Sequence, residues 1–156
     1  MHGLQLLGEP AWHGTAGALR FRLLGYVAAQ RRPVDRDHLA FLFWLEVPNE
    51  VARRNLRKAW FDLRRLPELA SAIGLHADST TVAWSDDSDL ARLQAQLEAG
   101  DTRAAVQTWV GPLLQGMDGG SVEFQRWLEP ARTRLTTQSE RVNDFASPLL
   151  VITHSP

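Results

Sequence analysis

The stretch VARRNLRKAWFDLRRL, residues 51–66, decides how this chain folds. Its apolar residues recur at steps of three and four, which places them on one face of an α-helix. This face comprises Ala52, Leu56, Ala59, Leu63 and Leu66. A proline is tolerated at the start of a helix and ends one elsewhere, so Pro48 and Pro67 predict a helix over about residues 48–66. The opposite face is basic and presents Arg54, Arg57, Lys58, Phe61 and Arg65, with Arg53 and Asn55 at the flanks.

Two shorter helices and a hairpin surround this segment in the predicted order. The pattern favours one helix over residues 21–30, which Arg31-Arg32-Pro33 ends, and a second helix that begins after the N-cap residue Asp35. Residues 75–77 and 80–84 are β-type runs on either side of a short polar turn, which predicts a hairpin. Gly and Pro spacing over residues 1–20 predicts a small antiparallel sheet of short strands in front of the helices.

The second half of the chain is predicted to be helical. Residues 85–89, Ser-Asp-Asp-Ser-Asp, form the expected linker and the cap of the next helix. Helices are expected over 90–99, closed by Gly100, over 102–110, capped by Asp101, and from Ser121 towards residue 142. Pro130 should kink or split the last of these, and the residues from 145 onward, which have no clear period, are expected to be disordered.

Positive charge is concentrated in residues 20–66, and the rest of the chain is acidic. Residues 20–66 hold 11 Lys and Arg against 5 Asp and Glu, whereas the rest of the chain holds 6 against 13. A basic segment beside an acidic one suggests that one part meets a polyanion, although chance clustering of solvated charge explains the pattern equally well. The chain has no cysteine and no signal-peptide pattern at its start, and we expect it in the cytoplasm.

The ordered set of segments resembles one family, the antibiotic-regulatory-protein activators. The matching stretches are LQLLGEP (4–10), RRPVDRDHLAFLFW (31–44), VARRNLRKAWFDLRRL (51–66), HADSTTVAW (76–84), AGDTRAAVQTWVGPLLQGM (99–117) and EFQRWLEPARTRL (123–135). The resemblance implies an α+β fold: an N-terminal winged helix-turn-helix, made of a small antiparallel sheet, three helices and a C-terminal hairpin, followed by an all-α, TPR-like bacterial transcriptional activator domain. We place the boundary between residues 1–84 and residues 85–156.

That resemblance also implies DNA binding and control of transcription, with double-stranded DNA as partner and RNA polymerase and a homodimer as further expected partners. The apolar groups Val106, Trp109, Leu113, Leu114 and Phe124, Trp127, Leu128 would stay uncovered in so short a helical array, which motivates the homodimer. The alternative is a protein-interaction adapter whose winged helix no longer binds DNA.

The basic helix face suits a DNA groove chemically. Arg54 and Arg57 could each bind guanine through two parallel hydrogen bonds, whereas Lys58 is better suited to a phosphate. Asn55 could read adenine and Phe61 could touch a thymine methyl group. Further DNA contacts are predicted for Arg53, Arg65, Arg32, Arg36 and, in the hairpin turn, Ser79, Thr80 and Thr81. For each of these residues, a solvated surface is the alternative.

Signals for other chemistry are weak. Asp86, Asp87 and Asp89 lack the glycine and distal Glu of a calcium loop, so helix capping explains them better. The histidines have no zinc-ligand spacing, and neither a nucleotide-binding motif nor a catalytic triad pattern is present. The sequence therefore predicts no enzyme, no cofactor and no metal site.

Overall fold

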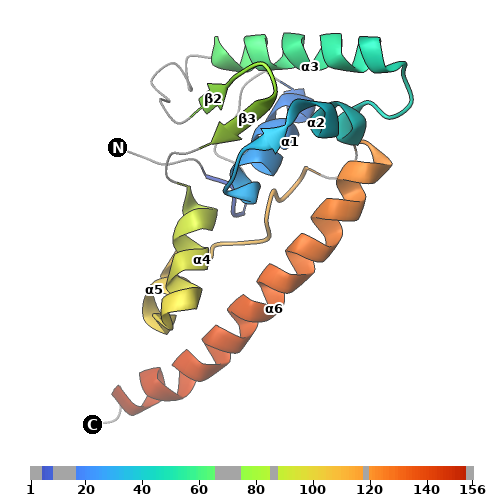
Figure 1. Cartoon of the computed structure of the whole chain (residues 1–156). Coiled ribbons are helices and arrows are strands. Elements are labelled where there is room, and N and C mark those ends of the chain that lie inside the picture. The colour runs from blue at the N-terminus through green and yellow to red at the C-terminus, as the bar shows by residue number, and fades with distance from the viewer. Residues whose placement is uncertain (1–4, 9–16, 66–74, 85–87, 118–119, 154–156) are drawn as a thin grey trace.

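A computed structural model describes residues 5–8, 17–65, 75–84, 88–117 and 120–153. Over these residues the chain is mostly helical, with a small antiparallel sheet. The helix α3 lies across one end of the molecule, and the C-terminal end of the long helix α6 lies at the other (Figure 1). The helices α1, α2 and the sheet lie between them.

The first helix begins earlier than the sequence pattern indicated. α1 spans Gly17–Gln30 and buries Leu23, Leu24 and Val27. The predicted strand over residues 18–20 is wrong, because Ala, Leu and Arg are strong helix formers and continue the helix backwards. Most of the expected N-terminal sheet lies outside the described residues. Its described part, residues 5–8, forms an isolated antiparallel bridge between Leu7 and Leu113 instead of a strand of a sheet.

The helices α2 and α3 are confirmed close to their predicted bounds. α2 spans Arg36–Phe43, and the carboxylate of its N-cap, Asp35, accepts a hydrogen bond from the amide of Asp37. α3 spans Asn49–Arg64, with Pro48 at its N-cap position. The two helices pack against each other, so α2 supports the buried face of α3.

The predicted hairpin is confirmed and belongs to a three-stranded sheet. β2 (Leu75–Ala77) and β3 (Thr81–Trp84) pair antiparallel, with Ala77 opposite Val82. The third strand, β1 (Val34–Asp35), pairs with the other edge of β3, giving the order β1-β3-β2. β1 was not predicted, because its two residues are too few for a period-two pattern.

The cap of α5 follows prediction, and the cap of α4 lies within the predicted residues 85–89. α4 (Asp89–Ala99) begins after Ser88, whose hydroxyl accepts from the amide of Ala91, and ends at Gly100, which adopts a left-handed conformation. α5 spans Thr102–Thr108, and the Asp101 carboxylate caps it by accepting from Ala104.

The last helix contradicts two expectations. α6 runs without interruption over Val122–Thr153, so Pro130 does not split it and the region from residue 145 is helical. Pro130 lies on the exposed side of the helix, where water can satisfy the carbonyl that loses its usual amide partner.

The N-terminus of α6 is anchored on α2. The hydroxyl of Ser121 donates to the carbonyl of Leu42 and accepts from the amide of Phe124. Phe124 is fully buried, with its ring 5.3 Å from that of Phe43, and the Trp127 ring lies 4.8 Å from that of Tyr26. The two halves of the chain therefore share one continuous hydrophobic core. The division into two domains at residue 84 stays a prediction.

The apolar groups that motivated the homodimer are covered within the chain itself. Leu113, Leu114, Phe124 and Leu128 are buried, and Val106, Trp109 and Trp127 are half-buried. The expectation that these faces stay uncovered is wrong, because the segment 109–117 and α6 fold back against α1 and α2. This observation removes the physical argument for a homodimer, which stays a prediction of the resemblance alone.

A buried carboxylate fixes the N-terminal segment to this core. Both oxygens of Asp89 accept hydrogen bonds, from the amide of Leu6 at 2.7 Å and from that of Leu7 at 2.9 Å. The amide of Leu90 donates to the same side chain at 2.8 Å. Burial raises the pKa of Asp89, and the three amide bonds oppose that shift. Asp89 thus joins the start of α4 to a segment more than eighty residues away.

Candidate nucleic-acid interface

The two faces of α3 are separated as the sequence predicted. Ala52, Leu56, Ala59 and Leu63 are buried, together with Trp60. The predicted face residue Leu66 lies outside the described residues. Because its apolar side is anchored on the core, α3 presents its other side to solvent at the end of the molecule (Figure 1).

The outward side of α3 is an accessible cationic surface. Arg54, Arg57 and Lys58 are all exposed, and none of the three has an ion-pair partner within the described part of the chain. Hydrophobic anchoring on one side and unpaired positive charge on the other allow this helix to approach a polyanion without first breaking an internal contact. We call Arg54, Arg57 and Lys58 the basic triplet.

Phe61 and Arg65 extend this surface towards the end of α3. The Phe61 side chain is 58% exposed, and the Arg65 guanidinium lies 5.2 Å from the centre of its ring. This is the geometry of a cation–π contact. Such a contact does not neutralise the positive charge of Arg65. Asn55 is half-buried at the flank of the helix, where the helical pattern placed it.

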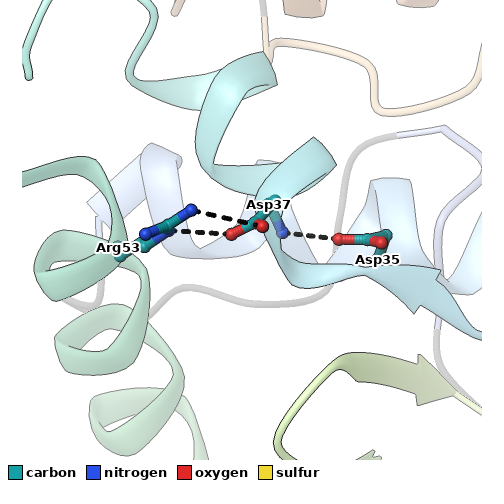
Figure 2. Close-up of polar contacts among 3 residues, drawn as sticks. All are labelled: Asp35, Asp37 and Arg53. Atoms are coloured by element: carbon teal, nitrogen blue, oxygen red, sulfur yellow. Dashed lines mark hydrogen bonds and ion pairs between the residues drawn. The ribbon is translucent and has the colours of Figure 1, made fainter. Parts of the chain in front are cut away.

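Arg53 lies differently from the basic triplet. Its Nε is 2.9 Å from Oδ1 of Asp37, and the same carboxylate lies 3.4 Å from a terminal nitrogen of the guanidinium. Figure 2 shows this pair beside the N-cap contact between Asp35 and Asp37. Arg53 therefore joins α3 to the first turn of α2. The helical wheel could not reveal this, because Asp37 lies on another element.

Arg32 and Arg36 come from the segment between α1 and α2. Arg32 is exposed, whereas Arg36 is half-buried and its Nε is enclosed without a hydrogen-bond partner. The amide of Arg36 donates to the carbonyl of Thr80, which joins the start of α2 to the hairpin turn. Arg32 is thus the more accessible of the two for a phosphate contact.

The hairpin turn is organised around Asp78. Its carboxylate accepts from the amides of Thr80 and Thr81, at 2.8 and 2.6 Å, and from both of their hydroxyls, at 3.1 and 3.2 Å. The threonine hydroxyls predicted to donate to phosphate therefore already have an acceptor. Ser79 is exposed at the tip. The turn is consequently rigid and anionic.

The acid titration of Asp78 tests this turn. The amide hydrogen bonds from Thr81 and Thr80 lower the pKa of Asp78 to about 2. Because the folded-state pKa is depressed, its contribution to stability is present above the ordinary value near 3.8 and is lost as the pH falls through about 2. Carboxyl carbon NMR should show Asp78 titrating near pH 2. Titration of Asp78 at its ordinary pKa near 3.8 would contradict the network.

The described residues hold no group of three His, Asp or Glu placed to bind a metal ion. Within the same residues, no helix combines the length and the apolar character needed to cross a bilayer.

Comparison with known proteins gives a likeness of fold. No family model matches the chain, and no curated protein matches its sequence. A solved structure, Mycobacterium tuberculosis EmbR in complex with a low affinity phosphopeptide, is similar over 90% of this chain, with a TM-score of 0.66 and 23% sequence identity. The matched region covers 43% of the EmbR chain, so this chain spans less than half of that protein. This likeness shows a common fold, in which three helices, a hairpin and further helices follow one another.

Proposed function

We propose that this chain is a sequence-specific DNA-binding transcription regulator, in which residues 1–84 form a winged helix and α3 enters the major groove. The observation that carries the proposal is the exposure of the basic triplet on a helix whose opposite side is buried in the core. An α-helix fits the major groove, and its outward arginines reach base edges there.

Two further findings support this proposal. The fold is similar to that of EmbR over most of the chain, and the ordered sequence segments resemble the antibiotic-regulatory-protein activators. In this proposal the helices α4–α6 belong to a TPR-like activator region that contacts RNA polymerase or a second copy of the chain.

Each residue of the basic surface has a proposed role. Arg54 and Arg57 read bases, because a guanidinium forms a planar fork that matches guanine. Lys58 binds a phosphate as a compact charge, and Arg32 binds the backbone from the start of α2. Arg53 positions α3 on α2 through Asp37 and contributes less to DNA affinity.

The salt dependence of binding tests the phosphate contact. Fluorescence anisotropy with duplex DNA at several salt concentrations should show affinity falling as salt rises, because bound cations release counterions from DNA. Lys58→Ala should lower the slope of log affinity against log salt by about 1. Arg126→Ala, an exposed arginine of α6 that is not part of the basic surface of α3, is the control and should leave the slope unchanged.

The alternative function is a protein-interaction adapter. It is favoured by the hairpin turn, where Asp78 places negative charge and holds the threonine hydroxyls, and by the neutralisation of Arg53. Anisotropy that stays flat even at low salt, with a chain that unfolds cooperatively, would support the adapter and contradict DNA binding.

A further inference from the structure

A hollow of about 580 Å³ lies where α1, α4 and α6 converge. Its size falls within the range of small-molecule sites, about 300–1,000 Å³. It is lined from three elements that are distant in sequence, so it forms only when the chain is folded. It is separate from the outward face of α3, and an inference about it does not depend on DNA binding.

Part of the lining of this hollow is apolar. Leu97 from α4 and Trp127 and Ala131 from α6 are half-buried and offer apolar surface, with Leu90, Leu113 and Leu135 buried beside them. This apolar surface favours a ligand with a hydrocarbon or aromatic body, since contact removes apolar surface from water.

The rim of the hollow is polar and carries a positive excess. Arg31 from the end of α1 and Arg134 from α6 contribute two guanidinium groups, against the single carboxylate of Glu98. Gln94 and Gln138 add hydrogen-bonding amides. The net charge of the rim therefore favours an anionic group on the ligand.

The two arginines differ in their contacts with the rest of the chain. Arg31 contacts Gln94 at 3.3 Å and Glu98 at 3.5 Å, both long and solvent-exposed interactions that contribute little. Arg134 is exposed and has no hydrogen-bond or ion-pair partner in the described ranges. The backbone of Arg31 lies in the left-handed region at φ 58°, a conformation that non-glycine residues adopt at a cost. That conformation places a guanidinium at the mouth of the hollow where α1 ends.

We propose that this hollow binds an amphipathic anion, a small molecule with an apolar body and a carboxylate or similar group. The apolar body contacts Leu97, Trp127 and Ala131. The anionic group accepts hydrogen bonds from Arg134, and Arg31 is the second cation of the lining. Arg134 supplies the discrimination between an anion and a neutral molecule of the same shape, because charge-assisted hydrogen bonds exceed neutral ones in strength.

Displacement of a fluorescent probe tests the site. Anilinonaphthalene sulfonate, which has an aromatic body and an anionic group, should bind the whole chain with increased fluorescence. Decanoate should displace it at about tenfold lower concentration than decanol, which has the same ten-carbon chain but an uncharged hydroxyl in place of the carboxylate. Arg134→Gln should remove most of this tenfold preference. The control Arg126→Gln, an exposed arginine of the same helix outside the hollow, should keep it.

A second variant keeps the result interpretable. Ala131→Trp places a bulky ring in the hollow and should abolish probe binding while the chain still unfolds cooperatively. Equal displacement by decanoate and decanol, an unchanged preference in Arg134→Gln, or unchanged probe binding in a folded Ala131→Trp chain would each overturn the proposal.

Discussion

Replacing Asp89 with alanine is expected to lower the free energy of unfolding by about 2–6 kcal/mol. Two buried amides, those of Leu6 and Leu7, would each lose their acceptor, at roughly 1–3 kcal/mol apiece. The side chain is only 6% exposed, so water cannot readily replace the carboxylate. Urea unfolding followed by tryptophan fluorescence measures the change, and amide hydrogen exchange at Leu6 and Leu7 should accelerate in the variant.

Asp101→Ala provides the matched control for this prediction. Asp101 also caps a helix by accepting from a backbone amide, but it is exposed and holds no distant segment. Its loss should cost about 1 kcal/mol. Asp89→Asn should fall between the two, because the amide keeps one acceptor oxygen but turns an NH₂ group towards an amide donor. An Asp89→Ala variant no less stable than Asp101→Ala would show that Asp89 acts only as a local cap.

The elements that depend on residues close in sequence, such as α3 and the helix caps, could be predicted from local patterns. The three- and four-residue spacing of Leu56, Ala59 and Leu63 fixes α3, because burial of that stripe decides which side faces the core. Asp35 and Asp101 were recognisable as caps, since an N-cap acts over two or three residues. For α4 the pattern placed the cap only somewhere within residues 85–89, and in the structure it is Ser88.

Contacts between distant segments could not be predicted in the same way. Asp89 looked like a capping residue, and nothing near it in the sequence indicated that Leu6 and Leu7 would donate to it. The length of α6 was missed because Pro130 signals a break wherever its environment is unknown, and only the fold shows that it lies on the exposed side.

In the candidate interface, too, the features set by local position were predicted, and the contacts between different elements were not. Exposure of Arg54, Arg57 and Lys58 follows from their position opposite the apolar stripe, and the sequence predicted it. The pairing of Arg53 with Asp37 depends on how α2 packs on α3, which no helical wheel contains. The hydrogen bonds that the Thr80 and Thr81 hydroxyls donate to Asp78 are local. In the sequence, only the acidic residue in the turn indicated them.

Replacing Arg54 and Arg57 together with alanine should have the largest effect on DNA recognition. If each guanidinium binds guanine through two hydrogen bonds, each contributes roughly 1–3 kcal/mol of discrimination, so the pair should reduce specific affinity by about 2–6 kcal/mol. The binding sequence is first found by selecting genomic fragments with the purified chain. Anisotropy at fixed salt then compares that duplex with a scrambled one of the same length.

The comparison between the two duplexes separates base reading from attraction to the backbone. Base contacts predict that the double variant loses far more affinity for the selected duplex than for the scrambled one, whereas phosphate contacts predict equal losses. Arg53→Ala is the comparison on the same helix. It should cost less affinity than the double variant and cost both duplexes alike, because Arg53 already pairs with Asp37 and that exposed ion pair contributes little to holding α3 on α2. If the double variant binds both duplexes as the parent does, α3 is not the DNA-binding helix, and the basic triplet must serve another partner.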